Sequence, residues 1–199
     1  PWVWASGLGR MLLSQMGIAI IACLSFNLLF GQGGMLSFGH AVYSGLGAFA
    51  AMHVLKLASA GGMAWPVSLM PLAGGLAGLG FAAVFGFVST RQSGTPFAMI
   101  TLGIGELASA ASLMLPGFFG GEGGLSGNRV IGPPVLGVSF GPQIQVYYLI
   151  AAYCFVCAAA MFAFTRTPLG RMLNAVRDNP VRVEFLGYSA QRVRWLAFM

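Results

Sequence analysis

The side chain with the clearest chemical potential in this sequence is Glu106, a carboxylate inside an apolar stretch. Within residues 92–128 the only charged side chains are those of Glu106 and Glu122, and Glu106 follows Pro96 by ten residues. In a helix this places it about 15 Å deep, near the middle of a hydrocarbon core of about 30 Å. A carboxylate there must find a partner or be protonated. Glu106 therefore either lines or gates a translocation path, or forms a structural tie to His40 or to Ser and Thr hydroxyls.

A second candidate cluster surrounds His40, which Ser37 and Gly39 precede in a segment of small residues. A lone histidine in such a setting more often forms a hydrogen bond between helices than binds a ligand. Nothing in the sequence places a second strong ligand beside it. We favour a packing role for His40, and we retain Ser37, Gly39 and His40 with Glu106 as candidates for a substrate path or gate.

Other catalytic and binding chemistries find little support. Cys154 and Cys157 form a C-x-x-C pair, but they lie in an apolar run without another Cys or His nearby, so no metal or redox site is predicted. The glycine-rich residues 117–127 lack the G-K-[ST] ending of a phosphate-binding loop. H-E-x-x-H does not occur, and the Gly-x-Ser-x-Gly match at residues 137–141 has no histidine near it in the sequence. The sequence predicts a chain with no catalytic residue, no cofactor and no ATPase activity of its own.

The elements that would position these residues are membrane-spanning helices. Hydrophobic residues make up 57% of the chain and charged residues 7%, against roughly 25% charged in soluble domains. Long intervals without any charge leave room for crossings of ~20 residues, and backbone in lipid must be helical or form a closed barrel. The apolar runs are continuous rather than alternating, which excludes a barrel. We predict an all-α polytopic membrane protein with one domain over residues 1–199, as a fragment truncated at both ends.

Five crossings and the start of a sixth are predicted from the apolar runs. A turn at residues 31–34 follows the first crossing, and the pattern leaves open whether residues 31–45 form a full crossing or a broken or re-entrant segment. In the third crossing, small residues recur every fourth position, a spacing that lets another helix approach closely. Glycine and proline dominate residues 116–142, which predicts a long loop. The predicted crossings are 11–30, 36–57, 67–89, 96–115 and 143–165.

Localised arginines predict the orientation. The net charge is +6, but most basic residues lie within residues 166–194 rather than along a soluble face, which argues against nucleic-acid binding. Such a cluster after a crossing marks a cytoplasmic loop. Counting back through five crossings places residues 116–142 outside and residues 31–34 inside. The isolated charges of Arg10 and Lys56 disagree with this orientation, and the larger cluster dominates them.

Residues 166–194 are predicted to fold as a helical hairpin. Leu169, Met172, Leu173 and Val176 form one apolar stripe. Asn179 and Pro180 can restart the helix as N-cap and first helical residue, and Gly187 can end it after two turns. On charge alone, the segment could equally be a solvated loop held on anionic membrane lipid.

Four separated stretches resemble one family, the permease subunits of branched-chain amino-acid ABC importers. In the loop of that family an acidic residue precedes a glycine by three positions, as Glu184 precedes Gly187 here. The stretches are NLLFGQGGMLSFGHAVYSGLGAFAAM, FAMITLGIGELASA, GGEGGLSGNRV and TPLGRMLNAVRDNPVRVEFLGYSAQRVRWLAF, which together follow the family in order over almost the whole chain.

The resemblance implies a bacterial inner-membrane permease subunit of an ATP-driven importer for branched-chain or related amino acids. It implies as partners a second permease subunit, two ATP-binding subunits and an extracytoplasmic solute-binding protein. It also implies that the hairpin couples to the ATP-binding subunit through Arg177, Asn179, Pro180, Glu184 and Gly187. Uptake of urea or another small amide, and ion-coupled secondary transport, remain open as alternatives.

Overall fold

Long apolar helices dominate the computed structural model, which describes residues 7–60, 66–127 and 141–199. The described residues form helices joined by turns and irregular segments, with no strand among them. By length and composition, 5 of the helical segments can cross a membrane. These are built on α1 (Gly7–Asn27), α2 (His40–Ser59), α3 (Met70–Ser89), α4 (Thr95–Met114) and α6 (Gln143–Arg166). The predicted all-α polytopic architecture is confirmed.

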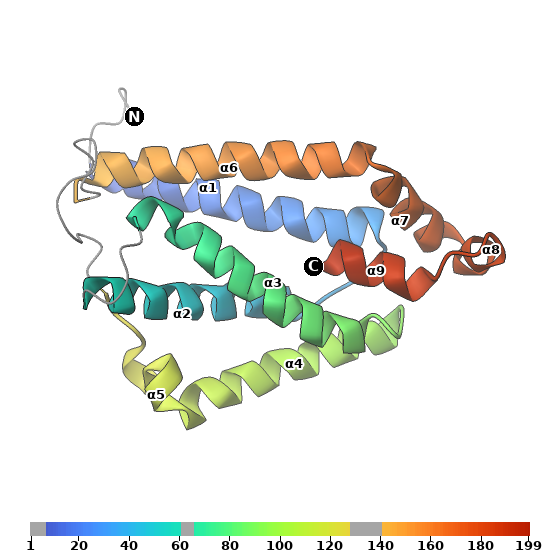
Figure 1. The fold of residues 1–199 in the computed structure, drawn as a ribbon, viewed down its shortest axis with the longest axis horizontal. Helices are drawn as coiled ribbons and strands as arrows, with labels where there is room; N and C mark the ends of the chain where they lie inside the picture. Colours follow the sequence, from blue (N-terminus) through green and yellow to red (C-terminus); the bar gives the residue numbers. More distant parts are fainter. Residues whose placement is uncertain (1–6, 61–65, 128–140) are drawn as a thin grey trace.

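Short helices lie at the two ends of this bundle (Figure 1). At one end, α4 is followed by α5 (Pro116–Phe119) and the 3₁₀ turn η3 (Gly121–Gly123). At the other end lie α7 (Pro168–Asp178), α8 (Pro180–Phe185) and α9 (Ala190–Phe198), which fold back on one another. We refer to α7–α9 as the hairpin and to the end of the bundle that carries it as the hairpin end.

The connection between α1 and α2 is a broken helix. α1 continues into a π-helical turn, η1 (Leu28–Gln32), after which the chain leaves helical geometry, with Gly34 at φ +64°. α2 starts only at His40. The predicted start at residue 36 is therefore too early, because hydropathy counts the apolar side chains of this stretch whether or not their backbone is helical. We refer to residues 31–39 as the broken segment.

The other predicted crossings agree with the observed helices to within a few residues. The predicted loop over residues 116–142 lies partly outside the described residues. In its first part the structure has α5 and η3 where an open loop was predicted, which is a correction. Pro116 suits the first turn of a helix, and Gly120 ends α5 at φ +82°.

Glycines bring α2 and α3 into backbone contact. A Cβ added at Gly47 would lie 2.6 Å from the Gly74 carbonyl oxygen. The predicted row of small residues on α3 thus has the expected role, since it lets a second helix approach closely. At the hairpin end of α3 the same row meets α9, where Gly86 packs against the Phe198 ring.

Alanine at Gly47 is expected to lower the melting temperature of the detergent-solubilised protein, whereas alanine at Gly45 on the same helix should not. Both changes gain about 1 kcal/mol of helix propensity. A Cβ at Gly45 meets no atom within 4 Å, but one at Gly47 must displace the α3 backbone. Such overpacking costs about 1–3 kcal/mol. Equal melting temperatures in a fluorescence-monitored thermal scan would contradict the close crossing.

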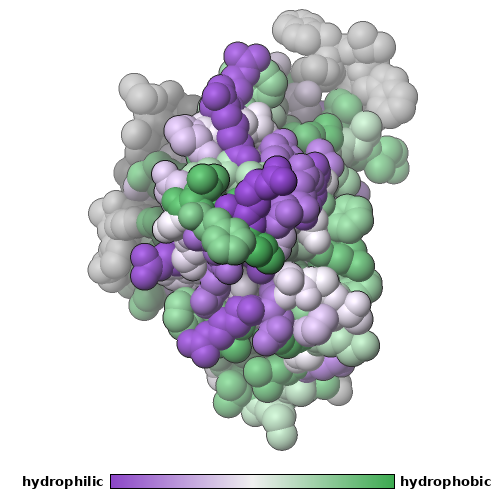
Figure 2. Space-filling view, turned by 90° about the vertical axis from the view of Figure 1, so that its right-hand side faces the viewer, coloured by the Kyte–Doolittle hydropathy of each residue, from purple (hydrophilic) through white to green (hydrophobic). Residues whose placement is uncertain are grey.

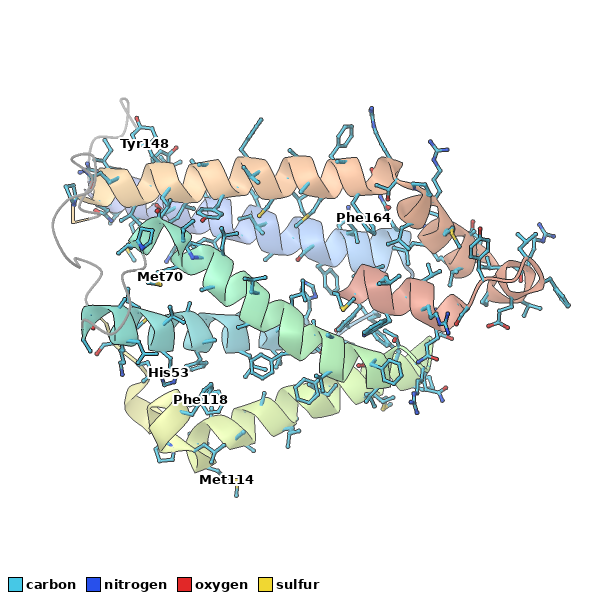
Figure 3. The ribbon with its side chains drawn as sticks, in the orientation of Figure 1. His53, Met70, Met114, Phe118, Tyr148 and Phe164 are labelled. Carbon is cyan, nitrogen blue, oxygen red and sulfur yellow. The ribbon has the colours of Figure 1, made fainter. Side chains whose placement is uncertain are left out.

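At the end opposite the hairpin, α5 is attached to α2 through His53 and Phe118. The His53 Nε2 atom donates a hydrogen bond to the Phe118 carbonyl at 2.7 Å, and the two rings stack with centroids 4.7 Å apart. Figure 3 shows the two labelled side chains between α2 and α5. The contact gives α5 a defined position on the bundle.

The hairpin shares one hydrophobic core with the broken segment and α4. Phe97 and Leu173 are fully buried in this core, at 0% exposure each. In addition, the Trp195 indole N–H of α9 donates to the Ala83 carbonyl of α3 at 2.9 Å. The hairpin is therefore packed against the bundle as part of it. The buried members of the core are Leu29, Met35, Phe97, Leu173, Val176, Val183, Ala190 and Val193.

Candidate functional site

The first helix of the hairpin, α7, is amphipathic as predicted. Leu173 and Val176 of the apolar stripe are buried in the shared core, and Leu169 and Met172 pack partly buried against it. The helix starts cleanly, because the Thr167 hydroxyl accepts a hydrogen bond from the Gly170 N–H at 3.3 Å. The stripe therefore faces the protein, so α7 is packed against the bundle and is not a free loop.

The second helix, α8, is short and closed at both ends. The Asn179 Oδ1 atom accepts from the Arg182 N–H at 3.0 Å, which confirms the predicted N-cap, and Pro180 is the first helical residue. At the other end, the Gly187 N–H donates to the Glu184 carbonyl at 2.9 Å and the Tyr188 N–H to the Val183 carbonyl at 3.3 Å. This pair of bonds is a Schellman motif, with Gly187 at φ +85°.

Between these caps, α8 and the residues after it present an apolar surface to the outside. Only Val183 of the helix points inward, at 4% exposure. Phe185 is 87% exposed and Leu186 is 72% exposed, although both are large apolar side chains. We refer to the exposed set as the apolar tip; it consists of Val181, Phe185, Leu186 and Tyr188.

The view onto the hairpin end shows apolar groups among strongly hydrophilic ones (Figure 2). Exposed arginines of the hairpin include Arg171, Arg182 and Arg192. Exposed large apolar side chains that lie close together mark a site of interaction with a protein or a membrane. These residues were not predicted from the sequence, although Phe185 and Leu186 stand out in a stretch rich in arginine.

Electrostatics within the hairpin connect α8 with α9. Burial lowers the pKa of the Arg194 guanidinium, and the Glu184 carboxylate opposes this shift by favouring the charged form. Arginine keeps its charge in any case. The Glu184 carboxylate therefore interacts electrostatically with Arg194 of the same hairpin.

Arg177 lies at the end of α7 and contacts the broken segment. Its Nη1 atom donates to the Gly31 carbonyl at 2.6 Å, and its Nε atom donates to Asp178 Oδ1 at 3.0 Å. Of the predicted coupling residues, Asn179, Pro180 and Gly187 shape α8, whereas Arg177 joins the hairpin to the rest of the chain.

His40, the first residue of α2, packs against α1. Its Nε2 atom lies 2.8 Å from the Ser25 hydroxyl, and its ring meets Phe26 edge to face with centroids 5.8 Å apart. This is a contact between helices, the role favoured from the sequence. His40 also borders a cavity of about 920 Å³ between α1, α2, α3, α6 and α9, together with Tyr43 and Phe164.

Ser37 and Gly39 lie in the broken segment, beside α4. Ser37 is 3% exposed, and no hydrogen bond of its hydroxyl is found among the described residues. Gly39 lies against the Thr101 carbonyl, where a Cβ would not fit. The Phe38 N–H donates to the Thr101 hydroxyl at 3.2 Å. The Ser37 hydroxyl is thus buried within the irregular backbone of the broken segment.

Glu106 lies near the middle of α4 and faces outward from this chain. Its side chain is exposed, and no partner for it is found among the described residues. The predicted alternative of a tie to His40 is not found, because His40 is paired with Ser25. Gly105 and Ala108 occupy the face of α4 toward α2. Because successive helical residues lie about 100° apart, Glu106 lies on a different face of the helix. Ser37, Gly39 and His40 thus lie together, and Glu106 faces elsewhere.

Known proteins match this chain over most of its length. A family model described as "Branched-chain amino acid transport system / permease component" matches residues 10–199. The chain belongs to this permease family. Within it, the chain is 26% identical over 205 residues to the high-affinity branched-chain amino acid transport system permease protein LivM of Escherichia coli. It is 28% identical over 204 residues to LivM of Salmonella typhimurium.

Each of these permease alignments covers 91% of this chain but 46% of the relative, so the chain spans about half the length of the curated permeases it matches. No solved structure matches the chain. The permease family and the apolar helices together establish a multi-pass membrane protein.

Proposed function

We propose that the chain is part of the membrane-spanning permease subunit of an ATP-driven importer for branched-chain or related amino acids in the bacterial inner membrane. The observation that carries this proposal is the apolar tip on α8, exposed between two caps and surrounded by arginines. A short helix closed at both ends can transmit a displacement, which a flexible loop would absorb. Membership of the permease family supports the substrate class.

In this proposal the hairpin end faces the cytoplasm, because basic residues gather in cytoplasmic segments. The apolar tip docks on an ATP-binding subunit, and Arg177, Asn179, Pro180, Glu184 and Gly187 give the hairpin its shape and attachment. Glu106, Ser37, Gly39 and His40 are proposed to line or gate the substrate path. A second permease subunit, two ATP-binding subunits and an extracytoplasmic solute-binding protein complete the assembly.

Phe185→Ser in the full-length permease is expected to abolish ATP-dependent leucine uptake in proteoliposomes that contain all partner subunits. The Phe185 side chain is 87% exposed in the tip, so its loss does not disturb the core. Loss of a central aromatic anchor weakens an interface by about 2 kcal/mol or more. Co-purification of the ATP-binding subunit should therefore fall at least about tenfold.

Phe185→Leu is the matched control, because it keeps an apolar side chain at the same position and should retain most of the uptake. Leucine uptake that follows an ion gradient without ATP would replace the proposal with secondary transport. Uptake of urea but not of leucine would show that the proposed substrate class is wrong, without contradicting the proposed coupling to the ATP-binding subunit. Normal retention of the ATP-binding subunit by Phe185→Ser would remove the tip from the interface.

A further inference from the structure

Arg177 joins two parts of the chain that are far apart in sequence. Its guanidinium bonds at the same time to the Gly31 carbonyl of the broken segment and to Asp178 of its own helix, at 2.6 and 3.0 Å. Bonds from a charged donor are stronger than neutral ones, and a planar guanidinium can hold two acceptors in a fixed arrangement. The Gly31 carbonyl lies in η1, where the helix is about to end.

The glycines of the broken segment fit closely against α7. A Cβ added at Gly34 would lie 2.6 Å from Cγ of Arg177, so the stem of Arg177 lies directly over this glycine. A Cβ at Gly33 would lie 3.4 Å from Cδ1 of Leu173, one turn earlier on α7. Met35 is 1% exposed in the core that contains Leu173. One side of the broken segment is thus held by α7.

The other side of the broken segment is held by α4. The Phe38 N–H donates to the Thr101 hydroxyl at 3.2 Å, and Gly39 lies against the Thr101 carbonyl. Thr101 is fully buried, at 0% exposure. It precedes Glu106 by five residues of continuous helix, about 7.5 Å along the axis.

We infer that Arg177 is a positioning residue that clamps the broken segment to α7, so that movement of the hairpin reaches α4 and Glu106 through residues 31–39. The inference rests on the proposed function for what drives that movement. A largely non-helical segment transmits a displacement only when both of its ends are held. The core side chains hold its middle, Thr101 holds one end, and the Arg177–Gly31 bond holds the other.

The clamp can be measured without transport by labelling a cysteine at Ser37, which is 3% exposed. Ser37→Cys is introduced into a full-length permease from which Cys23, Cys154 and Cys157 have been removed, and its reaction with a small membrane-permeant thiol reagent is followed. Loss of a hydrogen bond to a charged group shifts a local opening equilibrium by about tenfold. Adding Arg177→Met should therefore speed labelling about tenfold.

Arg171→Met is the matched control, because Arg171 lies on the exposed face of the same helix and the change removes the same charge. It should leave the labelling rate unchanged, and Arg177→Lys, which keeps a donor, should give an intermediate rate. Equal rates with and without Arg177→Met would overturn the clamp. This assay needs no ATP-binding subunit and no substrate, so its outcome is independent of the proposed function.

The coupling role is measured in the assembled complex. Arg177→Met should keep the ATP-binding subunit bound and lower substrate-stimulated ATP hydrolysis about tenfold. Loss of the ATP-binding subunit would place Arg177 in the subunit interface and overturn the inference. If Arg177→Met speeds the labelling of Ser37→Cys but leaves substrate-stimulated ATP hydrolysis normal, the clamp does not transmit movement of the hairpin. That outcome also overturns the inference.

Gly34→Ala tests the same clamp from the other side. At φ +64° an alanine is strained, and its Cβ displaces the Arg177 stem. The variant should reproduce the faster labelling and the loss of stimulation of Arg177→Met, and the double variant should be no worse than either single one, because both remove one interaction. Additive effects would show that Gly34 and Arg177 act separately and would overturn the shared clamp.

Discussion

A full-length permease that carries Gly187→Val is expected to reach the membrane. The amount of ATP-binding subunit that co-purifies with it and the rate of substrate-stimulated ATP hydrolysis should each fall at least about tenfold. Gly187 ends α8 at φ +85°, within a Schellman motif that also fixes Tyr188. A β-branched residue in this conformation costs about 1–2 kcal/mol. Nothing lies within 4 Å of a Cβ at this position, so the cost arises from the backbone alone.

Gly187→Asn is the control for this prediction. Asparagine adopts the left-handed conformation more readily than other non-glycine residues, so it should keep α8 and the apolar tip in place. The ratio of ATP-binding subunit to permease after affinity purification is the measurement. If Gly187→Val and Gly187→Asn both retain the subunit and normal stimulation, the shape of α8 is not what couples the two proteins.

Glu106→Gln is expected to assemble normally and to lower leucine uptake about tenfold or more. Glu106 faces out of this chain in mid-helix, flanked on α4 by Gly103 and Ala110, which are exposed as well. A carboxylate turned toward lipid at this depth costs several kcal/mol, so it must face another protein surface or a wet path. Small flanking residues leave room for either. Glutamine keeps the size of the side chain and removes its charge.

Glu106→Asp and Glu106→Ala decide what the carboxylate does. If the charge acts in a gate or path, Glu106→Asp should retain part of the uptake while Glu106→Gln does not. If the residue is a structural tie to another chain, Glu106→Gln should transport normally and Glu106→Ala should lower the yield of assembled complex. Normal uptake by Glu106→Ala would exclude both roles. The amount of complex in detergent and the rate of leucine uptake are measured for each variant.

The hairpin could be predicted in detail because its signals are local. Asn179, Pro180 and Gly187 act on the backbone within one turn of themselves, and the stripe on α7 contrasts with polar residues on its other face. The crossings could be counted for a similar reason, since length and apolar content suffice to identify them.

The arrangement of the crossings could not be predicted in the same way. A membrane helix is apolar on its lipid face and on its protein face, so periodicity does not show which side packs. The pairing of His40 with Ser25 and the outward direction of Glu106 depend on how the helices face one another. The helix break after residue 32 was predicted as a turn, but its extent to residue 39 was not, since Leu36 and Phe38 continue the apolar run without continuing the helix.

The crossing of α2 and α3 differs in mechanical character from the hairpin end. Gly47 and Gly74 meet backbone to backbone, whereas Phe97, Met35 and Leu173 pack side chain to side chain in the shared core. Packed helices can slide past one another by small shear movements, and a close-packed core of interlocked side chains transmits strain as a unit. We therefore expect α2 and α3 to accommodate a displacement of the hairpin by a small shear at their crossing, while the hairpin and its core move together.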